Sequence, residues 1–162
     1  MSNKDMISLD FYKSEYKILL ENYYLPEEQR NNTALPLDAL KQCEQDHTRY
    51  PIVILYNQIP SGFFVLHGWE GVKAYSHNKE AILLRAYSVN HTFQGKGIAK
   101  ASLQLLPEFI KENFPFANEI ILAVNLHNKV AQQVYQKCGF VDKGIRVMGP
   151  KGELLVYHLN IK

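Results

Sequence analysis

The 162-residue sequence is short of cysteine, of net charge and of long apolar runs. Its two cysteines, Cys43 and Cys138, provide neither a disulfide framework nor a metal-binding quartet. The 18 basic and 16 acidic residues give a net charge of +2, so no global field attracts nucleic acid. No stretch approaches the roughly 18 uninterrupted apolar residues that span a bilayer. These shortages exclude a disulfide scaffold and a membrane-spanning protein, and they argue against nucleic-acid binding.

The composition that remains is typical of a folded globular protein. Apolar residues make up 46% of the chain and charged residues 21%. A chain of this length buries roughly 68–70% of its unfolded surface, so its core needs no cross-link. The first 17 residues are charged throughout and contain no apolar signal segment. We therefore predict one soluble, cytoplasmic domain over residues 1–162.

The N-terminal third has a weak pattern of apolar spacing, which still supports a few elements. We predict a strand over residues 6–9, a helix over 13–23, an exposed polar loop over 27–33, a helix over 35–43, and a hairpin with strands 51–56 and 62–66 joined by a turn.

The C-terminal half alternates strands and helices more clearly. Residues 120–124 form an unbroken apolar run, which predicts a strand buried on both faces. Pro107 should bend the helix that begins near residue 97, or end its first segment. The remaining elements are strands over 81–89, 140–145 and 154–159 and a helix over 128–138. Together they predict a mixed α/β (α+β) single domain.

The most chemically suggestive segment is the loop between Val89 and the helix that begins near Gly97. A helix N-terminus attracts phosphate, and Gly95 and Gly97 allow the backbone to approach an anion closely. Lys96 and Lys100 add positive charge. A turn that needs glycine only for its conformation is an equal alternative. The dinucleotide fingerprint fails because Lys100 stands where Gly or Ala is required, and no Walker pattern is present.

Two segments resemble the GNAT superfamily of acetyl-CoA-dependent N-acetyltransferases. The run Gln94-Gly95-Lys96-Gly97-Ile98-Ala99 matches the family's Gln/Arg-x-x-Gly-x-Gly/Ala loop, directly after a strand. The family's Asn-x-x-Ala-x-x-x-Tyr-x-x-x-Gly-Phe segment is matched from Asn128 to Phe140. The resemblance covers residue 51 to the C-terminus, and residues 1–50 match only as two helices. It implies a GNAT-like fold, with a mixed, mostly antiparallel twisted sheet flanked by helices.

The resemblance also implies how acetyl-CoA binds as a co-substrate, with no metal. Backbone amides of residues 94–99 hold the pyrophosphate, with Lys100 beside them. The main chain of residues 87–89 pairs with the pantetheine arm like an added strand. Asn128 hydrogen-bonds the pantetheine, although it is at least as well explained as a helix cap. The implied binding residues are Tyr87, Ser88, Val89, Gln94, Gly95, Lys96, Gly97, Ile98, Ala99, Lys100 and Asn128.

Tyr135 is the catalytic residue that the resemblance implies. When an amine attacks a thioester a thiolate leaves, and a phenol within reach can protonate it. Spacing alone favours a packed core tyrosine, and only the surrounding family segment reverses that preference. Cys138 has no Asp or His nearby in the sequence to activate it, so we interpret it as structural.

The general base is not evident from the sequence. The strand over 81–89 contains no carboxylate, and Glu80 lies too far along it. His67, Glu70 and His91 are candidates that are better explained as surface residues. A chain of waters that deprotonates a bound ammonium group is an equal alternative.

The acceptor site has only weak sequence signals, and we expect residues 20–37 to build it. Arg85 is unusual in an apolar strand, where it either points toward the acceptor or, slightly favoured, pairs with an acid. The aromatic candidates for the walls of the pocket are Trp69, Tyr87, Tyr23 and Tyr24, although aromatic side chains pack more often than they bind. Glu27 and Glu28 hint at a cationic acceptor, but a solvated acidic loop explains them better.

These observations predict an enzyme that transfers an acetyl group from acetyl-CoA to a primary amine of a small molecule by direct attack in a ternary complex. The partners expected are the amine acceptor and a possible homodimer copy, with no nucleic acid and no membrane. One alternative is a protein or peptide N-acetyltransferase, which would have an open groove. Another is a non-catalytic acyl-CoA-binding module, which would keep the glycine loop without needing Tyr135.

Overall fold

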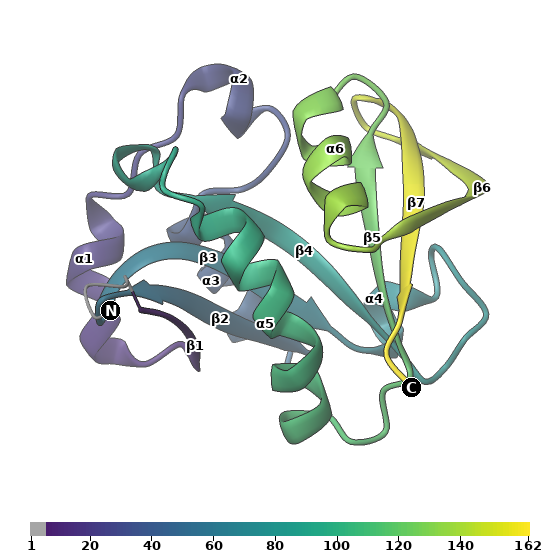
Figure 1. Ribbon diagram of the computed structural model, residues 1–162, viewed down its shortest axis with the longest axis horizontal. Helices are drawn as coiled ribbons and strands as arrows, with labels where there is room; N and C mark the ends of the chain where they lie inside the picture. Colours follow the sequence, from purple (N-terminus) through teal and green to yellow (C-terminus); the bar gives the residue numbers. More distant parts are fainter. Residues whose placement is uncertain (1–5) are drawn as a thin grey trace.

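A seven-stranded sheet organises residues 6–162, the part of the chain that the computed structural model describes (Figure 1). The strand order is β1-β2-β3-β4-β5-β7-β6, and every neighbouring pair is antiparallel except β4 and β5. The strands are β1 (Ile7–Phe11), β2 (Arg49–Tyr56), β3 (Ile59–His67), β4 (Ala81–Val89), β5 (Glu119–Asn125), β6 (Val141–Gly149) and β7 (Gly152–Asn160). The helices are α1 (Lys17–Glu21), α2 (Glu27–Arg30), α3 (Pro36–Gln45), α4 (Trp69–Val72), α5 (Ile98–Asn113) and α6 (Lys129–Lys137). The predicted mixed, mostly antiparallel sheet with flanking helices is confirmed.

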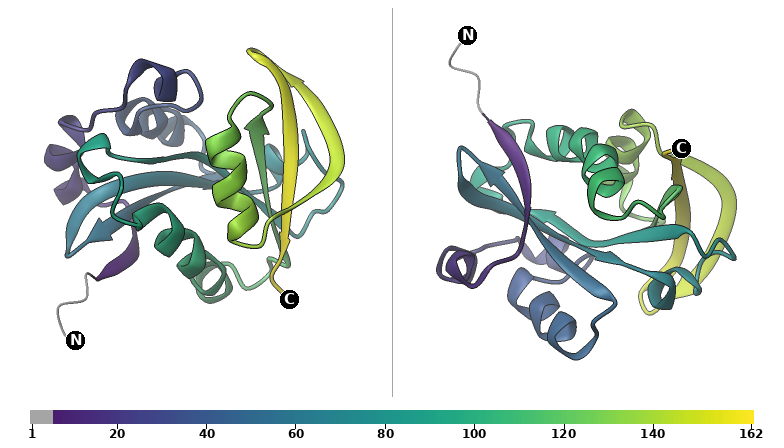
Figure 2. Two further views of the ribbon diagram at one scale, coloured as in Figure 1. Left: turned by 45° about the horizontal axis from the view of Figure 1, so that its top comes forward. Right: turned by 90° about the horizontal axis from the view of Figure 1, so that it is seen from below.

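Helices cover both faces of the sheet (Figure 2). α5 and α6 pack on one face, and α1 and α3 pack on the other. Because side chains alternate along a strand, β2 sends Ile52 and Ile54 toward α5 and sends Val53 and Leu55 toward α1 and α3. All four of these side chains are buried. Strands covered on both faces read as continuous apolar runs, and the run in β5 is buried on both faces as predicted.

The feature that positions the site is a divergence between β4 and β5. Their parallel pairing covers only the first four residues of β4, Ala81–Leu84. The β3–β4 register then shifts between Phe63 and Val65, because β4 contains one extra residue at that point. Ala86 lies in this bulge with φ of 54°, a conformation that alanine rarely adopts. Bulges bend a strand and increase its twist, which carries the end of β4 away from β5.

Several local predictions for the N-terminal half are wrong. The loop predicted over residues 27–33 contains one helical turn, α2, which begins after Pro26. Pro26 is the N-cap of this turn, and its ψ of 155° places it outside the helix. The helix predicted over residues 13–23 is broken into a 3-10 turn, η1 (Ser14–Tyr16), and the short α1. The helical turn α4 was not predicted at all.

The turn between β2 and β3 is shorter than predicted. Its turn consists of Asn57 and Gln58, with φ values of 49° and 71°. Two residues with positive φ are the usual connection of twisted antiparallel strands. Pro60, which lies between the two predicted strands, is the second residue of β3. In the C-terminal half, α5 continues past Pro107 to Asn113, so the proline does not end the helix.

Candidate active site

The divergence of β4 and β5 opens a cleft of about 740 Å³. Its walls come from the end of β4, the glycine loop, the starts of α5 and α6, the end of β5 and the α2 segment. Ten of the twelve site residues predicted from the sequence line this cleft, and Lys96 and Lys100 do not. The ten are Tyr87, Ser88, Val89, Gln94, Gly95, Gly97, Ile98, Ala99, Asn128 and Tyr135.

The glycine loop has the form of an anion cradle. Gly95 and Gly97 have φ values of 82° and 78°, and a Cβ built on either would meet no atom within 4 Å. Gly97 is the N-cap of α5, and the first helical bond runs from the Ala101 N–H to the Gly97 carbonyl. The N–H groups of residues 98–100 therefore have no partner within the helix and point out of its positive end. An anionic pyrophosphate group fits these donors and this open space.

Gln94 holds the loop in place through its side chain. Its Nε2 donates to the Val89 carbonyl oxygen and to Gln29 Oε1, both at 2.8 Å. Gln29 Nε2 returns a hydrogen bond of 3.3 Å to Gln94 Oε1. The backbone N–H of Gln94 is already donated to the His91 carbonyl oxygen at 3.1 Å. Gln94 therefore ties the loop to β4 and α2, and the free donors of the loop begin after it.

Tyr135 projects from α6 toward the end of β4. Its ring packs edge-on against Tyr87 and Phe140, with centroid distances of 6.3 and 5.8 Å. No hydrogen-bond partner of its hydroxyl occurs within residues 6–162, and the hydroxyl is not among the fully enclosed unpaired atoms. Burial raises the pKa of Tyr135, because the ionised phenolate loses its hydration. The Tyr135 phenol that lines the cleft is therefore protonated and can donate a hydrogen bond.

The side chains at the end of β4 lock the neighbouring elements together. The Tyr87 hydroxyl donates to the Ala99 carbonyl oxygen at 3.1 Å and contacts the Ser102 hydroxyl, which joins β4 to α5. On the opposite face, the Ser88 and Tyr23 hydroxyls share a hydrogen bond of 2.8 Å. The side-chain hydroxyls of residues 87 and 88 are thus hydrogen-bonded within the protein, and the backbone of this segment faces the cleft.

Asn128 caps α6, which confirms the helix-cap interpretation of this residue. Its Oδ1 accepts a hydrogen bond of 3.2 Å from the Ala131 N–H, which satisfies one of the free donors at the helix start. The residue also lines the cleft, so its amide nitrogen remains available there. Contact with pantetheine stays a prediction.

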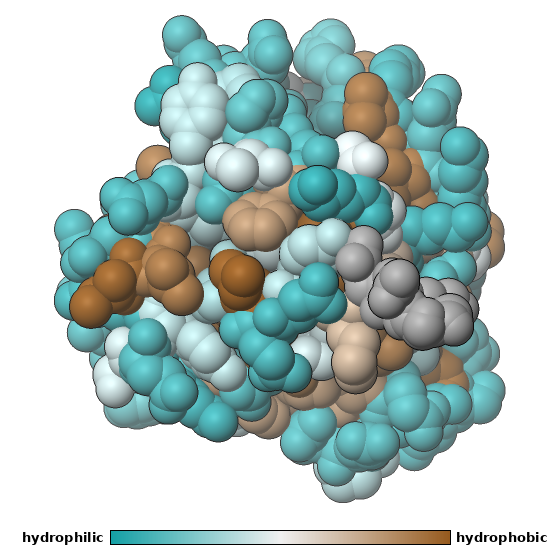
Figure 3. Space-filling view, turned by 60° about the vertical axis from the view of Figure 1, so that its left-hand side comes forward, coloured by the Kyte–Doolittle hydropathy of each residue, from teal (hydrophilic) through white to brown (hydrophobic). Residues whose placement is uncertain are grey.

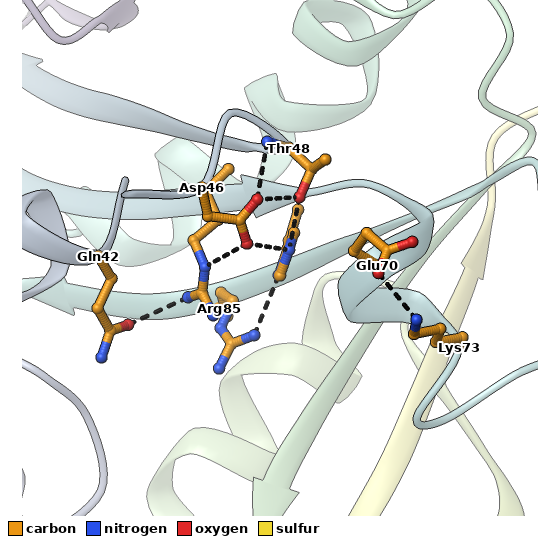
Figure 4. Close-up of polar contacts among 8 residues, drawn as sticks. Gln42, Asp46, Thr48, Glu70, Lys73 and Arg85 are labelled. Carbon is orange, nitrogen blue, oxygen red and sulfur yellow. Dashed lines mark hydrogen bonds and ion pairs between the residues drawn. The ribbon is translucent and has the colours of Figure 1, made fainter. Parts of the chain in front are cut away.

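None of the general-base candidates from the sequence lines the cleft. His67 is buried at the end of β3, with both ring nitrogens in contact with polar partners. Glu70 is exposed and pairs with Lys73 at 2.8 Å (Figure 4). Glu80 binds Asn118 at the far end of β4, and His91 is exposed. The titratable side chains that do line the cleft besides the tyrosines are Glu28, Arg85, His127 and Lys129.

Three of the aromatic side chains suggested for the acceptor pocket, and Cys138, also lie outside the cleft lining. Trp69, Tyr23 and Tyr24 do not line it. Tyr23 and Trp69 pack in the interior clusters behind the sheet, and Tyr24 is exposed. The Cys138 thiol lies 4.0 Å from the Lys100 carbonyl oxygen, outside the cleft lining, and burial raises its pKa. A protonated thiol away from the cleft agrees with a structural role.

The α2 segment, residues 27–33, forms one wall of the cleft. In Figure 1, α2 lies between the start of α5 and the end of β5. Asn125 Nδ2, at the end of β5, donates to Asn32 Oδ1 at 3.1 Å. Lys151, in the β6–β7 turn, donates to the Asn31 carbonyl oxygen at 2.8 Å. Together with the Gln29–Gln94 pair, these bonds tie the segment to both walls. The contributions of Asn125 and His127 had no signal in the sequence.

Neither a bilayer-spanning helix nor a cluster of three metal-ligating side chains is found within residues 6–162.

Comparisons with known proteins agree on one family. The model of the acetyltransferase (GNAT) family matches residues 12–140. The uncharacterized N-acetyltransferase YbbJ of Bacillus subtilis is 44% identical over 153 residues, which are 94% of this chain and 96% of YbbJ. A second B. subtilis protein, the uncharacterized N-acetyltransferase YdgE, is 32% identical over 71 residues, 44% of each chain.

Solved structures share the fold at low sequence identity. The aminoglycoside acetyltransferase AAC(6')-Ib in complex with coenzyme A has a TM-score of 0.75 at 17% identity, covering 96% of this chain and 95% of that one. The ribosomal-protein-S5-alanine acetyltransferase of Vibrio fischeri has a TM-score of 0.65 at 15% identity, covering 96% and 93%. With the match over most of the chain and the YbbJ identity, these findings establish that the chain belongs to the GNAT family of acetyltransferases, as an acetyl-CoA-dependent N-acetyltransferase.

Proposed function

We propose that this enzyme acetylates a primary amine of a small molecule, with both substrates bound in the cleft at the same time. The observation that carries the proposal is that one cleft joins the two faces of the sheet. The glycine loop and Tyr135 lie on the side of α5 and α6, and Glu28 and Arg85 lie on the side of α1–α3.

The bulge in β4 explains how one strand serves both sides. Arg85 pairs with Val65, which packs in the α1 and α3 cluster, so Arg85 lies on that face. Tyr87 stacks on Phe64 in the α5 cluster, on the opposite face. The cofactor therefore enters from the α5 side with its phosphates on the loop, and the acceptor enters from the α2 side.

Acetyl-CoA supplies an acetyl thioester, and attack by the amine nitrogen forms the amide and releases the thiol. Beyond Leu84, the edge of β4 that faces β5 has no strand partner. The Val89 carbonyl oxygen accepts from Gln94 Nε2, and the remaining backbone groups of residues 87–89 on this edge pair with the pantetheine arm and polarise the thioester carbonyl. The Tyr135 hydroxyl donates its proton toward the sulfur as the carbon–sulfur bond breaks, and the proton that the amine nitrogen loses on forming the amide restores the phenol through solvent.

A small acceptor is favoured over a peptide because the α2 segment is bonded to both walls of the cleft. An open groove for a polypeptide would need this segment to be displaced, breaking the Asn32–Asn125 and Asn31–Lys151 hydrogen bonds. The structural neighbours do not decide this point, since one is an aminoglycoside acetyltransferase and another a ribosomal-protein acetyltransferase.

A thiol-release assay with acetyl-CoA tests the proposal over a panel of amines, amino acids, aminoglycosides and peptides. We expect release with a small primary amine and a product heavier by one acetyl group in mass spectrometry. Turnover restricted to peptides would identify the protein acetyltransferase alternative. Tight acetyl-CoA binding without release in the presence of any amine would identify a non-catalytic binding module.

A further inference from the structure

Arg85 is a partly buried guanidinium group without a carboxylate partner. It precedes the β4 bulge and lines the cleft. Within residues 6–162, its one hydrogen bond runs from Nη1 to His67 Nδ1 at 3.1 Å. No carboxylate oxygen of these residues lies within 4.0 Å of it, because Asp46 pairs with Arg49 and His67 instead. The acid partner that the sequence favoured for Arg85 is therefore absent from this part of the chain.

The unused donors of Arg85 remain accessible. An arginine side chain carries five N–H donors, and His67 accepts from one nitrogen only. Among the described residues, the fully enclosed side-chain atoms without a partner are Thr33 Oγ1 and His158 Nε2. The other nitrogens of Arg85 thus keep contact with solvent, and the cleft is the space that the residue lines.

A partly buried chain of hydrogen bonds fixes the direction of this guanidinium (Figure 4). His67, 3% exposed, accepts from Arg85 at Nδ1, so its proton lies on Nε2, which contacts Thr48 Oγ1 at 3.0 Å. The Thr48 hydroxyl donates to Asp46 Oδ1 at 2.6 Å. Burial, helped by Arg49 and Arg85, lowers the pKa of His67 and keeps the ring neutral. His67 is therefore a positioning residue for Arg85.

The charges in the cleft favour an anion at Arg85. Glu28 is the one carboxylate among the described residues that line the cleft. An acceptor with several ammonium groups would meet Arg85 with little negative charge to compensate. A guanidinium that has lost part of its hydration is stabilised by an anionic partner, and its planar fork matches the two oxygens of a carboxylate.

We propose that the acceptor is an amine that also carries a carboxylate, as an amino acid does, and that Arg85 binds this carboxylate from the α2 side of the cleft. The inference rests on the proposed acetyl transfer and names the substrate class for it. Polyamines and aminoglycosides are then poor acceptors, although the fold is shared with an aminoglycoside acetyltransferase.

Calorimetry on the coenzyme A-bound protein tests this recognition without relying on turnover. The probes are the common amino acids, each compared with its own carboxamide, which keeps the amine and the shape but loses the charge. The best amino acid should bind wild type about 30-fold to 1,000-fold more tightly than its carboxamide, since removing one partner of a buried charge pair has an effect of this size. Arg85→Met should abolish that ratio, and Arg85→Lys should retain part of it. Arg146→Met, a control cation in β6 that pairs with Asp142 outside the cleft lining, should preserve it.

Acetyl transfer to the same pairs separates this inference from the proposed function. Selective binding of the amino acid through Arg85 without transfer would support the assignment of Arg85 and contradict the proposed function. Transfer to carboxamides or polyamines as fast as to amino acids would overturn the Arg85 assignment while leaving acetyl transfer intact. Tighter binding of aminoalkylphosphonates than of any carboxylate would also overturn it. If Arg85→Met does not fold, the ratios of amino acid to carboxamide affinity in wild type and in Arg85→Lys still test whether Arg85 binds the carboxylate.

Discussion

Burial shifts the pKa values of two titratable side chains near the cleft in opposite directions. It raises the pKa of Tyr135, whose charged form is the deprotonated one, and lowers the pKa of His67, whose charged form is the protonated one. Both residues are therefore neutral near pH 7. A neutral phenol can donate a proton in the cleft, and a neutral imidazole can accept a hydrogen bond from Arg85.

Replacing Tyr135 by Phe removes the hydroxyl and retains the ring contacts with Tyr87 and Phe140. We expect kcat to fall about 10²- to 10⁴-fold, the usual contribution of general acid catalysis. Affinity for acetyl-CoA should change little, because we expect the loop amides to carry that binding. Steady-state kinetics with the best acceptor and a thermal melt measure both effects. A normal kcat in single-turnover experiments would show that the tyrosine only packs.

The lowered pKa of His67 makes stability depend on pH in a defined direction. Below about pH 6.5, the ordinary pKa of histidine, the unfolded chain binds a proton that folded His67 does not accept. Wild type should therefore lose stability as the pH falls from 7 toward 5, with a contribution of at most about 1.4 kcal/mol per pH unit from this residue. His67→Gln should show a shallower fall in Tm over this range. Parallel Tm profiles for the two proteins would contradict the assignment.

The glycine loop and the first turn of α5 work as one element. Two glycines with positive φ turn the chain so that the free N–H groups of α5 face open space. Gln94 braces this turn against β4 and α2. We expect the element to bind coenzyme A through its backbone, so its function should depend on conformation more than on the chemistry of its side chains.

Gly97→Val tests the loop, because a branched side chain disfavours positive φ and occupies the open space. We expect coenzyme A binding by calorimetry to be lost or weakened by at least about tenfold, while the protein remains folded. Gly144→Val is a matched control: Gly144 has φ of 90°, also has no atom within 4 Å of a built Cβ, and lies in β6 away from the cleft. The control should lose a similar amount of stability and keep its affinity. Equal affinities in the two variants would refute the phosphate cradle.

The whole molecule consists of two groups of strands joined by the short β4–β5 pairing. Only four residue pairs, all between β4 and β5, join the group β1–β4 to the group β5–β7. We therefore expect side-chain packing under α5 to hold the two groups together. In Figure 3, apolar residues on the face shown occur in small groups among hydrophilic ones. A homodimer stays a prediction that sedimentation can test.

Ile120→Ala tests the junction between the two groups. Ile120 is fully buried, pairs with Ile82 across the junction and packs in the α5 cluster. Large-to-small changes at such sites cost about 2–5 kcal/mol, so chemical denaturation should show a loss of this size. Met148→Ala, at a position that is 75% exposed in β6, should change the free energy of unfolding by less than about 0.5 kcal/mol. A small effect at Ile120 would show that the two groups are joined mainly elsewhere.

The sequence alone determined the parts of this protein that depend on local pattern. The apolar runs of β4 and β5, the periodicity of α5 and α6 and the two family segments identified the fold and the family. These signals are local because strand alternation, helical spacing and glycine conformation involve neighbouring residues only. Weakly patterned elements such as α2 and α4 were missed, since one polar helical turn has no period to detect.

The tertiary structure decided which side chains line the cleft. Glu28, Arg85 and Asn125 come from three distant segments and line one cleft only because a bulge in β4 separates it from β5. Likewise, His67 reads as a possible base in the sequence, but folding places it behind Arg85 with both nitrogens in contact with polar groups. Such roles depend on distances between residues far apart in the chain, and those distances are set by packing of the whole sheet.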